Sequence, residues 1–276
     1  MIQLRPEVSF QQNRDISVFL NETIITESDR KEFTQNVKYE ERVAQQSSGL
    51  SLFEDVVSKS NFIKTFELLI PELDLFSGAT VLEMGACHGW ASVMVKVTNP
   101  SCYVVASDLV SEMVEHSTKW ENLLGTQLDE KWAFNCRDIP FDDEQIDRIF
   151  TFASFHHFGD RGNYKPVLTE MIRTLKKGGK IVLLYEPSSP RYLYKWAFER
   201  VNSSRKNTGE YVDEDVLVIP ELDTIVRELG CTLTISLFPF HLYRDGFLSG
   251  NYYYIISKLG SLQKLFVSTV NLVISK

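Results

Sequence analysis

The sequence predicts an α/β fold with a doubly wound, mostly parallel sheet and helices on both faces. A strand at the start of residues 81–90 runs into a glycine turn and a helix. A second strand, residues 103–108, ends in an acidic residue, and apolar residues at helical spacing recur between later strands. Strands that alternate with helices are typical of parallel sheets. In such folds ligands bind at the carboxyl edge of the sheet, so functional residues are expected at the strand ends.

The first strand contains Glu83 and leads into a turn with Gly85 and Gly89, four residues apart, where a helical pattern begins. Glycines at such a turn allow a ligand to approach the backbone closely. The dinucleotide fingerprint G-x-G-x-x-G fails, because Cys87 and Trp90 stand where it needs glycines. The nucleotide P-loop fails as well, since no Gly-Lys-Ser/Thr follows. A glycine turn without a ligand is the alternative at this point.

Two further strands end in carboxylates. Asp108 closes residues 103–108, 23 positions after the first glycine of the turn, and Asp138 closes residues 131–138. A strand–helix–strand unit would bring the first of these beside the glycine turn, where it can accept two hydrogen bonds from a ribose diol. An Asp at a strand end often caps a turn. With Glu83, three acidic residues end three successive strands. Turn capping explains such a series poorly, and a ligand-binding site explains it better.

The rest of the sheet follows in order. A fourth apolar strand precedes the adjacent His156 and His157, and a helix is expected over about residues 164–175. Two lysines and Gly178 predict the end of this helix, with glycine as its C-cap. Residues 180–187 then form a buried strand.

Over roughly residues 60–187 this series resembles the class I S-adenosylmethionine (SAM)-dependent methyltransferases. The turn resembles motif I, acidic-x-Gly-x-Gly-x-Gly, with Cys87 in place of the middle glycine, and residues 175–187 resemble motif III. The resemblance implies an enzyme whose sheet has seven mostly parallel strands and a reversed last hairpin. It also implies SAM as cofactor, S-adenosyl-L-homocysteine as product, and no metal.

The resemblance further implies which residues hold the cofactor. The glycine turn would bind the methionine end of SAM and Asp108 the ribose. Asp138 would bind the adenine, while the next residue packs on the ring. The full implied set is Glu83, Gly85, Ala86, Gly89, Asp108, Leu109, Asp138, Ile139, Phe152 and Ala153.

Candidate catalytic residues follow from the chemistry of the donor. A sulfonium already activates the methyl group, so the protein must mainly position the reactants and exclude water. A hydroxyl acceptor usually needs a general base too. His157 is the first candidate, because imidazole titrates near neutrality, and His156 and Glu186 are the others. A structural interpretation stays open, since the histidine pair often has that part in the family and Glu186 precedes a proline.

Attachments surround the core. Residues 1–60 are polar and predict a mostly helical extension, either a cap over the SAM pocket or a solvated segment packed on the sheet. Residues 61–276 form the predicted methyltransferase domain. Within it, residues 188–219 and 241–264 are expected to be substrate lids, although the first can also be a dimerisation element. Residues 247–276 lack acids and are rich in aromatics, so contact with a membrane surface is the alternative for that segment.

Composition narrows the function. The chain has 276 residues, 43% of them hydrophobic, and a net charge of −8, which argues against nucleic acid as the main partner. Four scattered cysteines without a C-x-x-C pair indicate reduced thiols and a cytoplasmic location. The expected acceptor is a small molecule such as a sugar or secondary metabolite. A non-catalytic SAM-fold partner subunit is the alternative, and no acceptor atom, pathway or oligomeric state is favoured.

Overall fold

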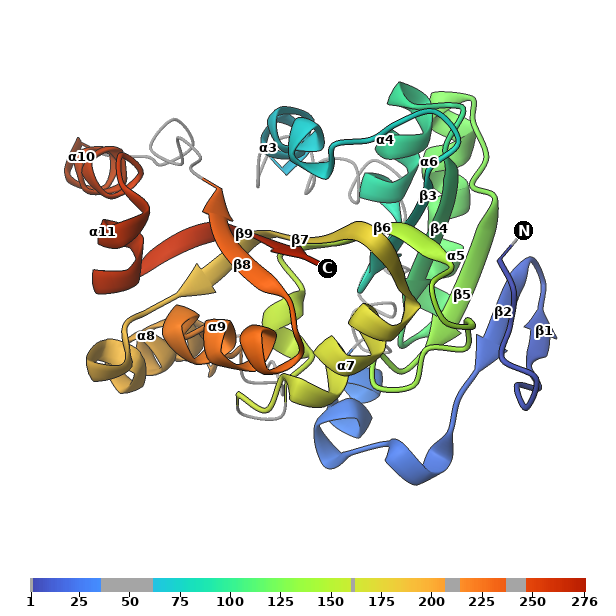
Figure 1. Cartoon of the computed structure of the whole chain (residues 1–276), viewed down its shortest axis with the longest axis horizontal. Coiled ribbons are helices and arrows are strands. Elements are labelled where there is room, and N and C mark those ends of the chain that lie inside the picture. Colours follow the sequence, from blue (N-terminus) through green and yellow to red (C-terminus); the bar gives the residue numbers. More distant parts are fainter. Residues whose placement is uncertain (1, 36–61, 160–161, 207–213, 237–246) are drawn as a thin grey trace.

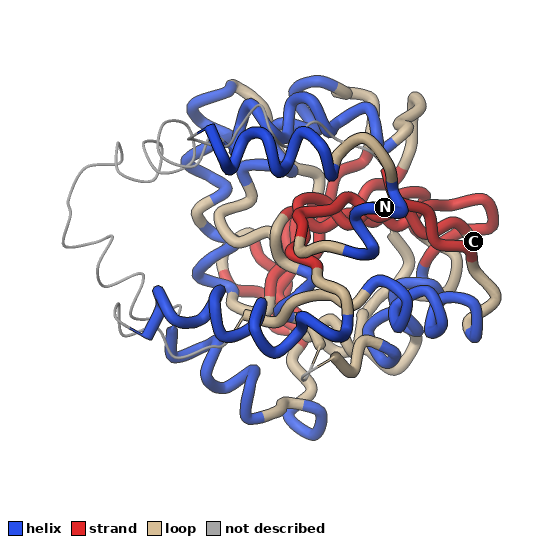
Figure 2. The backbone as a smooth tube through the Cα atoms, turned by 90° about the vertical axis from the view of Figure 1, so that its left-hand side faces the viewer, coloured by secondary structure: helices blue, strands red, loops and turns tan. Residues whose placement is uncertain are grey.

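A computed structural model describes residues 2–35, 62–159, 162–206, 214–236 and 247–276 of the chain. Its described strands form one nine-stranded sheet with helices on both faces (Figures 1 and 2). The order is β1-β2-β5-β4-β3-β6-β7-β9-β8. The predicted α/β class is therefore confirmed, and the sheet has two strands more than the seven that were expected.

The strands are β1 Gln11–Asn13, β2 Ile16–Phe19, β3 Thr80–Met84, β4 Tyr103–Asp108, β5 Glu130–Phe134, β6 Ile146–Phe152, β7 Leu175–Ser188, β8 Thr232–Ser236 and β9 Ser268–Ser275. The helices are η1 Glu22–Ile24, α3 Phe62–Leu69, η3 Ile70–Leu73, α4 Trp90–Thr98, α5 Ser111–Glu115, α6 Ser117–Leu124, η4 Phe155–His157, α7 Lys165–Thr174, η5 Arg191–Leu193, α8 Tyr194–Lys206, α9 Ile219–Glu228, α10 Phe247–Ile256 and α11 Gly260–Leu265. Residues 27–35 are helical as well.

The topology creates a crevice at the centre of the sheet. β3 pairs in parallel with β4 on one side and with β6 on the other, so the chain order reverses between β3 and β6. Helices α3, α4 and α6 bury their apolar faces on one side of the sheet, and α7 and α9 on the other. β9 runs antiparallel to both β7 and β8, as the predicted reversed hairpin requires. Ligands of doubly wound sheets bind where the strand order reverses.

The N-terminal segment differs from the expected helical extension. β1 and β2 form an antiparallel hairpin, and β2 adds to the sheet in parallel with β5. Ile16 is only 1% exposed against the core, while the β-branched residues around it suit a pleated strand. The hairpin covers what would otherwise be an open sheet edge. The short 3-10 helix η1 and a helix at residues 27–35 follow, and residues 36–61 lie outside the described part of the chain.

The predicted C-cap of α7 is wrong. The helix ends at Thr174, because Leu175 is extended, fully buried and paired with Ile146 as the first residue of β7. Gly178, with φ +75°, lies within β7 rather than at the helix end, and its N–H donates to the carbonyl of Lys276. Burial of the leucine in the sheet thus ended the helix before the glycine.

The C-terminal helices α10 and α11 lie between β8 and β9 in the chain, on the far side of the molecule from the N-terminal hairpin (Figure 1). Phe247 and Leu248 are each 83% exposed at the start of α10. Among the described residues no helix is both long and apolar enough to cross a membrane. Contact of residues 247–276 with a membrane surface stays a prediction, and residues 241–246 of the second expected lid lie outside the described ranges.

Candidate active site

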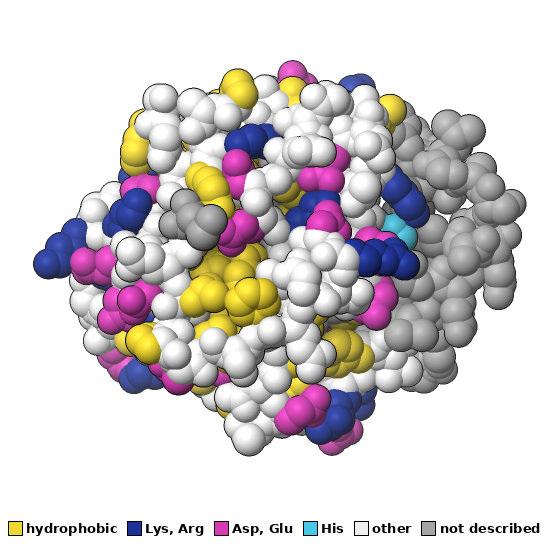
Figure 3. All heavy atoms as spheres, turned by 90° about the vertical axis from the view of Figure 1, so that its right-hand side faces the viewer, with side chains coloured by type: hydrophobic (Ala, Val, Ile, Leu, Met, Phe, Trp, Pro, Cys, Tyr) yellow, Lys and Arg dark blue, Asp and Glu magenta, His cyan; other side chains and the backbone are white. Residues whose placement is uncertain are grey.

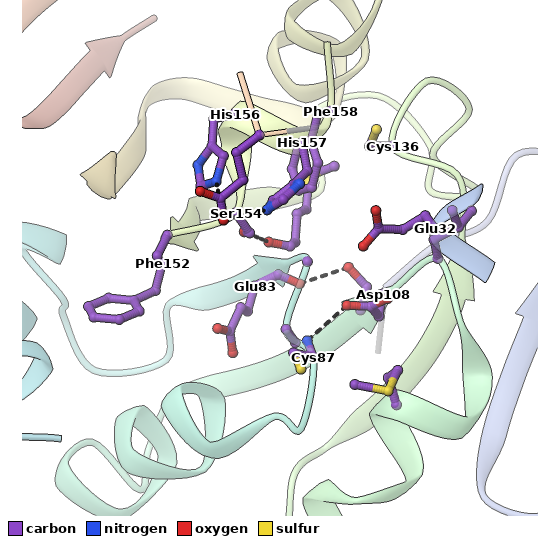
Figure 4. Close-up of a pocket in the computed structure, with 18 of the residues that line it drawn as sticks. Glu32, Glu83, Cys87, Asp108, Cys136, Phe152, Ser154, His156, His157 and Phe158 are labelled. Atoms are coloured by element: carbon purple, nitrogen blue, oxygen red, sulfur yellow. Dashed lines mark hydrogen bonds and ion pairs between the residues drawn. The ribbon is translucent and has the colours of Figure 1, made fainter. Parts of the chain in front are cut away.

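A pocket of about 930 Å³ opens at the carboxyl ends of β3, β4, β5 and β6 (Figure 4). Seven of the ten predicted cofactor residues line it: Glu83, Gly85, Ala86, Asp108, Leu109, Phe152 and Ala153. His156 and His157 line it too. The structure therefore brings together strand-end residues that the sequence had placed at one edge of the sheet.

The two glycines of the turn, Gly85 and Gly89, have different structural roles. At Gly85, φ is +68° and an added Cβ would lie 2.7 Å from Ser154 Oγ and 2.8 Å from the Phe158 ring, so only glycine fits on this wall of the pocket. At Gly89, φ is +67° and a Cβ would lie 2.6 Å from the Cβ of Ser117. Gly89 does not line the pocket, and it instead allows α4 to pack against α6.

Asp108 is held rigidly at the end of β4. One carboxylate oxygen accepts the Cys87 N–H at 2.8 Å and the other accepts the Val110 N–H at 3.1 Å. Burial raises the pKa of Asp108 above its ordinary value, while these amides and that of Leu109 act in the opposite direction. Each oxygen keeps a lone pair for a further donor. Such an arrangement can accept hydrogen bonds from two neighbouring hydroxyls of a ligand.

Glu83 lies deep in the same wall and is only 2% exposed. Its carboxylate accepts hydrogen bonds from the backbone N–H and the hydroxyl of Ser92, in the first turn of α4. Burial raises its pKa to about 8, against the effect of these bonds and assisted by nearby Asp108. With Glu32, which Figure 4 shows beside Asp108, these side chains give the pocket an acidic lining. A cationic ligand beside these carboxyl groups would favour their charged forms over the neutral forms that burial favours.

Asp138 and Ile139 are not at the pocket, contrary to expectation. The carboxylate of Asp138 accepts hydrogen bonds from Arg5 Nη2 at 2.5 Å and Asn21 Nδ2 at 2.9 Å. Ile139 is fully buried in the core, outside the pocket lining. Asp138 therefore braces the N-terminal segment against the sheet.

Asn135 and Cys136 line the pocket at the position that was assigned to Asp138 and Ile139. The reason is that β5 ends at Phe134, four residues earlier than predicted. The Asn side chain accepts the Arg137 N–H at 3.0 Å, a local turn of the kind Asn favours. This turn signal in the sequence could have identified the strand end.

The N-terminal helix forms a further wall that sequence reasoning did not resolve. Ser28, Asp29 and Glu32 line the pocket. Asp29 accepts hydrogen bonds from Asn135 Nδ2 at 3.2 Å and from the guanidinium of Arg137. These contacts tie the helix at residues 27–35 to the turn after β5.

Glu186 supports the loop after β6 and does not line the pocket. It is fully buried and accepts a hydrogen bond from His156 Nδ1 at 2.8 Å. Its oxygens also accept the backbone N–H groups of Ser154, Phe155 and His156 at 3.0–3.2 Å. The carboxylate is thus a positioning group for the loop that carries both histidines, which agrees with the structural alternative for this residue.

One wall of the pocket is aromatic. Phe62 stacks on Trp90 with ring centroids 6.4 Å apart, and Phe152 stacks on Tyr185 at 5.6 Å. Phe62 also meets Phe152 edge to face at 5.3 Å. All four rings line the pocket and exclude water from this side of it.

Three lining residues other than glycine have a left-handed backbone. The φ angles of Cys87, Ala153 and Tyr185 are +48°, +51° and +60°. Such residues are costly and gather at functional sites, where surrounding contacts hold them. Here the Cys87 N–H is bound by Asp108 and the Tyr185 N–H by Asn271 Oδ1 at 2.9 Å.

Comparison with known proteins identifies the family of the region that supplies much of this pocket. Residues 82–183 match the family model described as "Methyltransferase domain". This region is a class I SAM-dependent methyltransferase domain. SAM is the cofactor of this family, and the matched region contains the glycine turn, Asp108 and both pocket histidines.

Relatives of known activity are distant. A demethylmenaquinone methyltransferase of Clavibacter sepedonicus is 26% identical over 54% of this chain and 62% of its own length. A tRNA (carboxymethyluridine(34)-5-O)-methyltransferase of Arabidopsis thaliana is 21% identical over 77% of this chain and 59% of its own. The chain thus matches less than two thirds of either relative.

The likeness in three dimensions is also to methyltransferases. A phosphoethanolamine N-methyltransferase of Haemonchus contortus, solved with S-adenosylhomocysteine, has a TM-score of 0.55 at 12% identity. The likeness covers 77% of this chain and 52% of that one, and it shows a shared fold.

Proposed function

We propose that the chain is a cytoplasmic methyltransferase that uses SAM to methylate a small-molecule acceptor bound in the same pocket. One observation carries the proposal. A single pocket has the glycine turn and the rigid Asp108 carboxylate at one end and a water-excluding aromatic wall with two imidazoles at the other. That juxtaposition serves a reaction in which two ligands must meet.

The cofactor half fits SAM in shape and charge. Gly85 lines the pocket at the turn, Asp108 has lone pairs for a ribose diol, and Asn135 and Cys136 would contact the adenine. The acidic lining suits the ammonium and sulfonium of SAM. When bound, SAM supplies an activated methyl group. The side chains named here hold and orient it.

The acceptor half would position the nucleophile. The aromatic rings of Phe62, Trp90, Phe152 and Tyr185 provide flat apolar surfaces for a ring or chain. His157 and Glu214 line the same pocket, with His157 Nε2 at 3.9 Å from Glu214 Oε1. This pair can orient a hydroxyl group and accept its proton, the task for which His157 was the first candidate.

A small molecule suits this pocket better than nucleic acid. Of the described residues that line it, none is lysine or arginine, so phosphate groups would find no such cation to neutralise their charge. On the face shown in Figure 3, acidic and basic side chains are mixed around one hydrophobic patch, without a continuous basic surface. The quinone named for one relative illustrates the class of acceptor, a ring that carries oxygen, that an aromatic wall would bind.

The test is release of S-adenosylhomocysteine from SAM by the purified full chain. The acceptor panel contains hydroxylated aromatics, quinols, sugars and, for comparison, unmodified tRNA. We expect product with a small molecule and none with Asp108→Ala. Product with tRNA alone would contradict the small-molecule proposal. SAM binding without turnover of any acceptor would favour the non-catalytic partner subunit.

A further inference from the structure

We propose that His156, His157 and Glu214 bind a divalent transition-metal ion of the zinc class at the acceptor end of the pocket. The binding proposal stands on the side-chain geometry alone. Its suggested use, to hold an oxygen of the acceptor, rests on the proposed function.

The distances fit one shared ion. Glu214 Oε1 lies 3.8 Å from His156 Nε2 and 3.9 Å from His157 Nε2, and one donor atom from each residue lies within 4.8 Å of the others. These separations are too long for hydrogen bonds. Two ligands of a tetrahedral zinc ion, each about 2.0–2.1 Å from the metal, are about 3.4 Å apart. Small side-chain rotations would therefore close the three atoms around one ion.

His156 is prepared as a ligand. Its Nδ1 contacts Glu186 Oε2 at 2.8 Å, which favours the tautomer with the proton on Nδ1 and a lone pair on Nε2. The side chain is only 4% exposed, and Nε2 has no hydrogen-bond partner among the described residues. A buried nitrogen without a partner is costly. A carboxylate behind a histidine is also the usual outer support of a metal-bound imidazole.

The elements that carry the ligands are fixed separately. The two histidines lie on η4, whose backbone N–H groups Glu186 binds. Glu214 precedes Asp215, whose carboxylate accepts hydrogen bonds from the hydroxyls of Tyr164 and Tyr194 at 2.7 Å each. The N–H of Glu214 donates to Asn202 Oδ1 at 2.8 Å. Both sides of the cluster are therefore anchored before any ion binds.

The donor set decides the class of ion. Two imidazoles and one carboxylate suit Zn²⁺, Fe²⁺ or Mn²⁺, whereas Mg²⁺ and Ca²⁺ prefer oxygen ligands. Three protein ligands also leave a coordination position open, as in catalytic zinc sites. An ion here would bind the oxygen of a hydroxyl acceptor and lower its pKa, and the released proton would pass to water. In that state His157 is a ligand and the ion takes over the task of the free imidazole.

The test is equilibrium dialysis of the metal-free full chain against Zn²⁺, with SAM binding measured separately on the same samples. We expect one bound ion per chain. Glu214→Gln and His157→Ala should each weaken binding at least about 100-fold, since even outer-shell partners contribute about 10–100-fold. The matched control is Glu228→Gln, an exposed carboxylate on α9 that pairs with Lys165 and should bind Zn²⁺ like the unmodified chain.

Substitution of Co²⁺ gives a second measurement, because its visible absorption reports nitrogen and oxygen ligands directly. Absence of stoichiometric Zn²⁺ binding, or binding that Glu214→Gln leaves unchanged, would overturn the metal site. If Zn²⁺ binds as expected while SAM does not bind, the proposed function fails and the metal site stands. If SAM binds and Zn²⁺ does not, the metal site alone fails.

Discussion

The two halves of the pocket are held in different ways. The cofactor half is built from the ends of three consecutive strands, and backbone amides fix its central carboxylate, as in the bond from Cys87 to Asp108. The acceptor half is built from side chains of separate segments, including Phe62, His157 and Glu214. The fold itself therefore provides the cofactor site, whereas packing between distant segments makes the acceptor site.

The largest effect is expected for Gly85→Ala. A left-handed alanine costs about 1–2 kcal/mol, and the clash with Ser154 and Phe158 adds about 1–3 kcal/mol. The matched control is Gly125→Ala, which has a similar φ of +65° and nothing within 4 Å of the added Cβ. Urea denaturation should show a loss of about 2–5 kcal/mol at position 85 and only the backbone cost at 125. Equal losses would show that the turn is not tightly packed.

A smaller effect concerns pH. Because burial raises the pKa of Glu83 from 4.5 to about 8 in the folded state, its contribution to stability is fully present below 4.5 and lost as pH rises through about 8. The slope from this one group is at most about 1.4 kcal/mol per pH unit. Glu83→Gln should therefore flatten the fall in unfolding free energy between about pH 5 and about pH 8. If the unfolding free energy of Glu83→Gln falls with pH as steeply as that of the unmodified chain, the raised pKa of Glu83 is contradicted.

Asn135→Ala and Asp138→Ala test which residue is at the adenine end. Asn135→Ala should weaken SAM binding about 10-fold, the equivalent of one hydrogen bond. Loss of Asp138 should instead lower stability by about 1–2 kcal/mol, since Arg5 and Asn21 lose their shared partner. Calorimetric titration and thermal denaturation of both variants separate the effects. Weaker SAM binding in Asp138→Ala, with a loss of stability in Asn135→Ala, would instead support Asp138 as the adenine-binding residue.

Part of the fold and part of the site could be predicted from the sequence. The glycine turn and the edge with Asp108 were predictable, because chain order alone fixes where parallel strands end. Asn135 was missed through an error of four residues in the end of β5. The pairing of β2 with β5 and the approach of Glu214 to His157 depend on contacts between distant segments, which no local pattern encodes.

The smallest effect is expected for Cys87→Gly. Its φ of +48° is unfavourable for a side chain, so glycine should stabilise the chain by about 0.5–1 kcal/mol. SAM affinity should change little, because the N–H that contacts Asp108 is retained. Thermal denaturation with and without SAM measures both. A destabilised variant would show that the thiol contributes packing that the backbone strain does not outweigh.

The most direct test of the account is calorimetric titration of the full chain and of Asp108→Ala and Glu214→Gln with SAM and S-adenosylhomocysteine. We predict saturable binding of both ligands, weakened at least about 100-fold by loss of the Asp108 carboxylate, because hydrogen bonds to charged groups contribute about 1.5–3 kcal/mol each. The Glu214→Gln variant should bind both ligands normally, because Glu214 belongs to the acceptor half of the pocket. Unchanged binding in Asp108→Ala, or binding of NADH in place of SAM, would contradict the account.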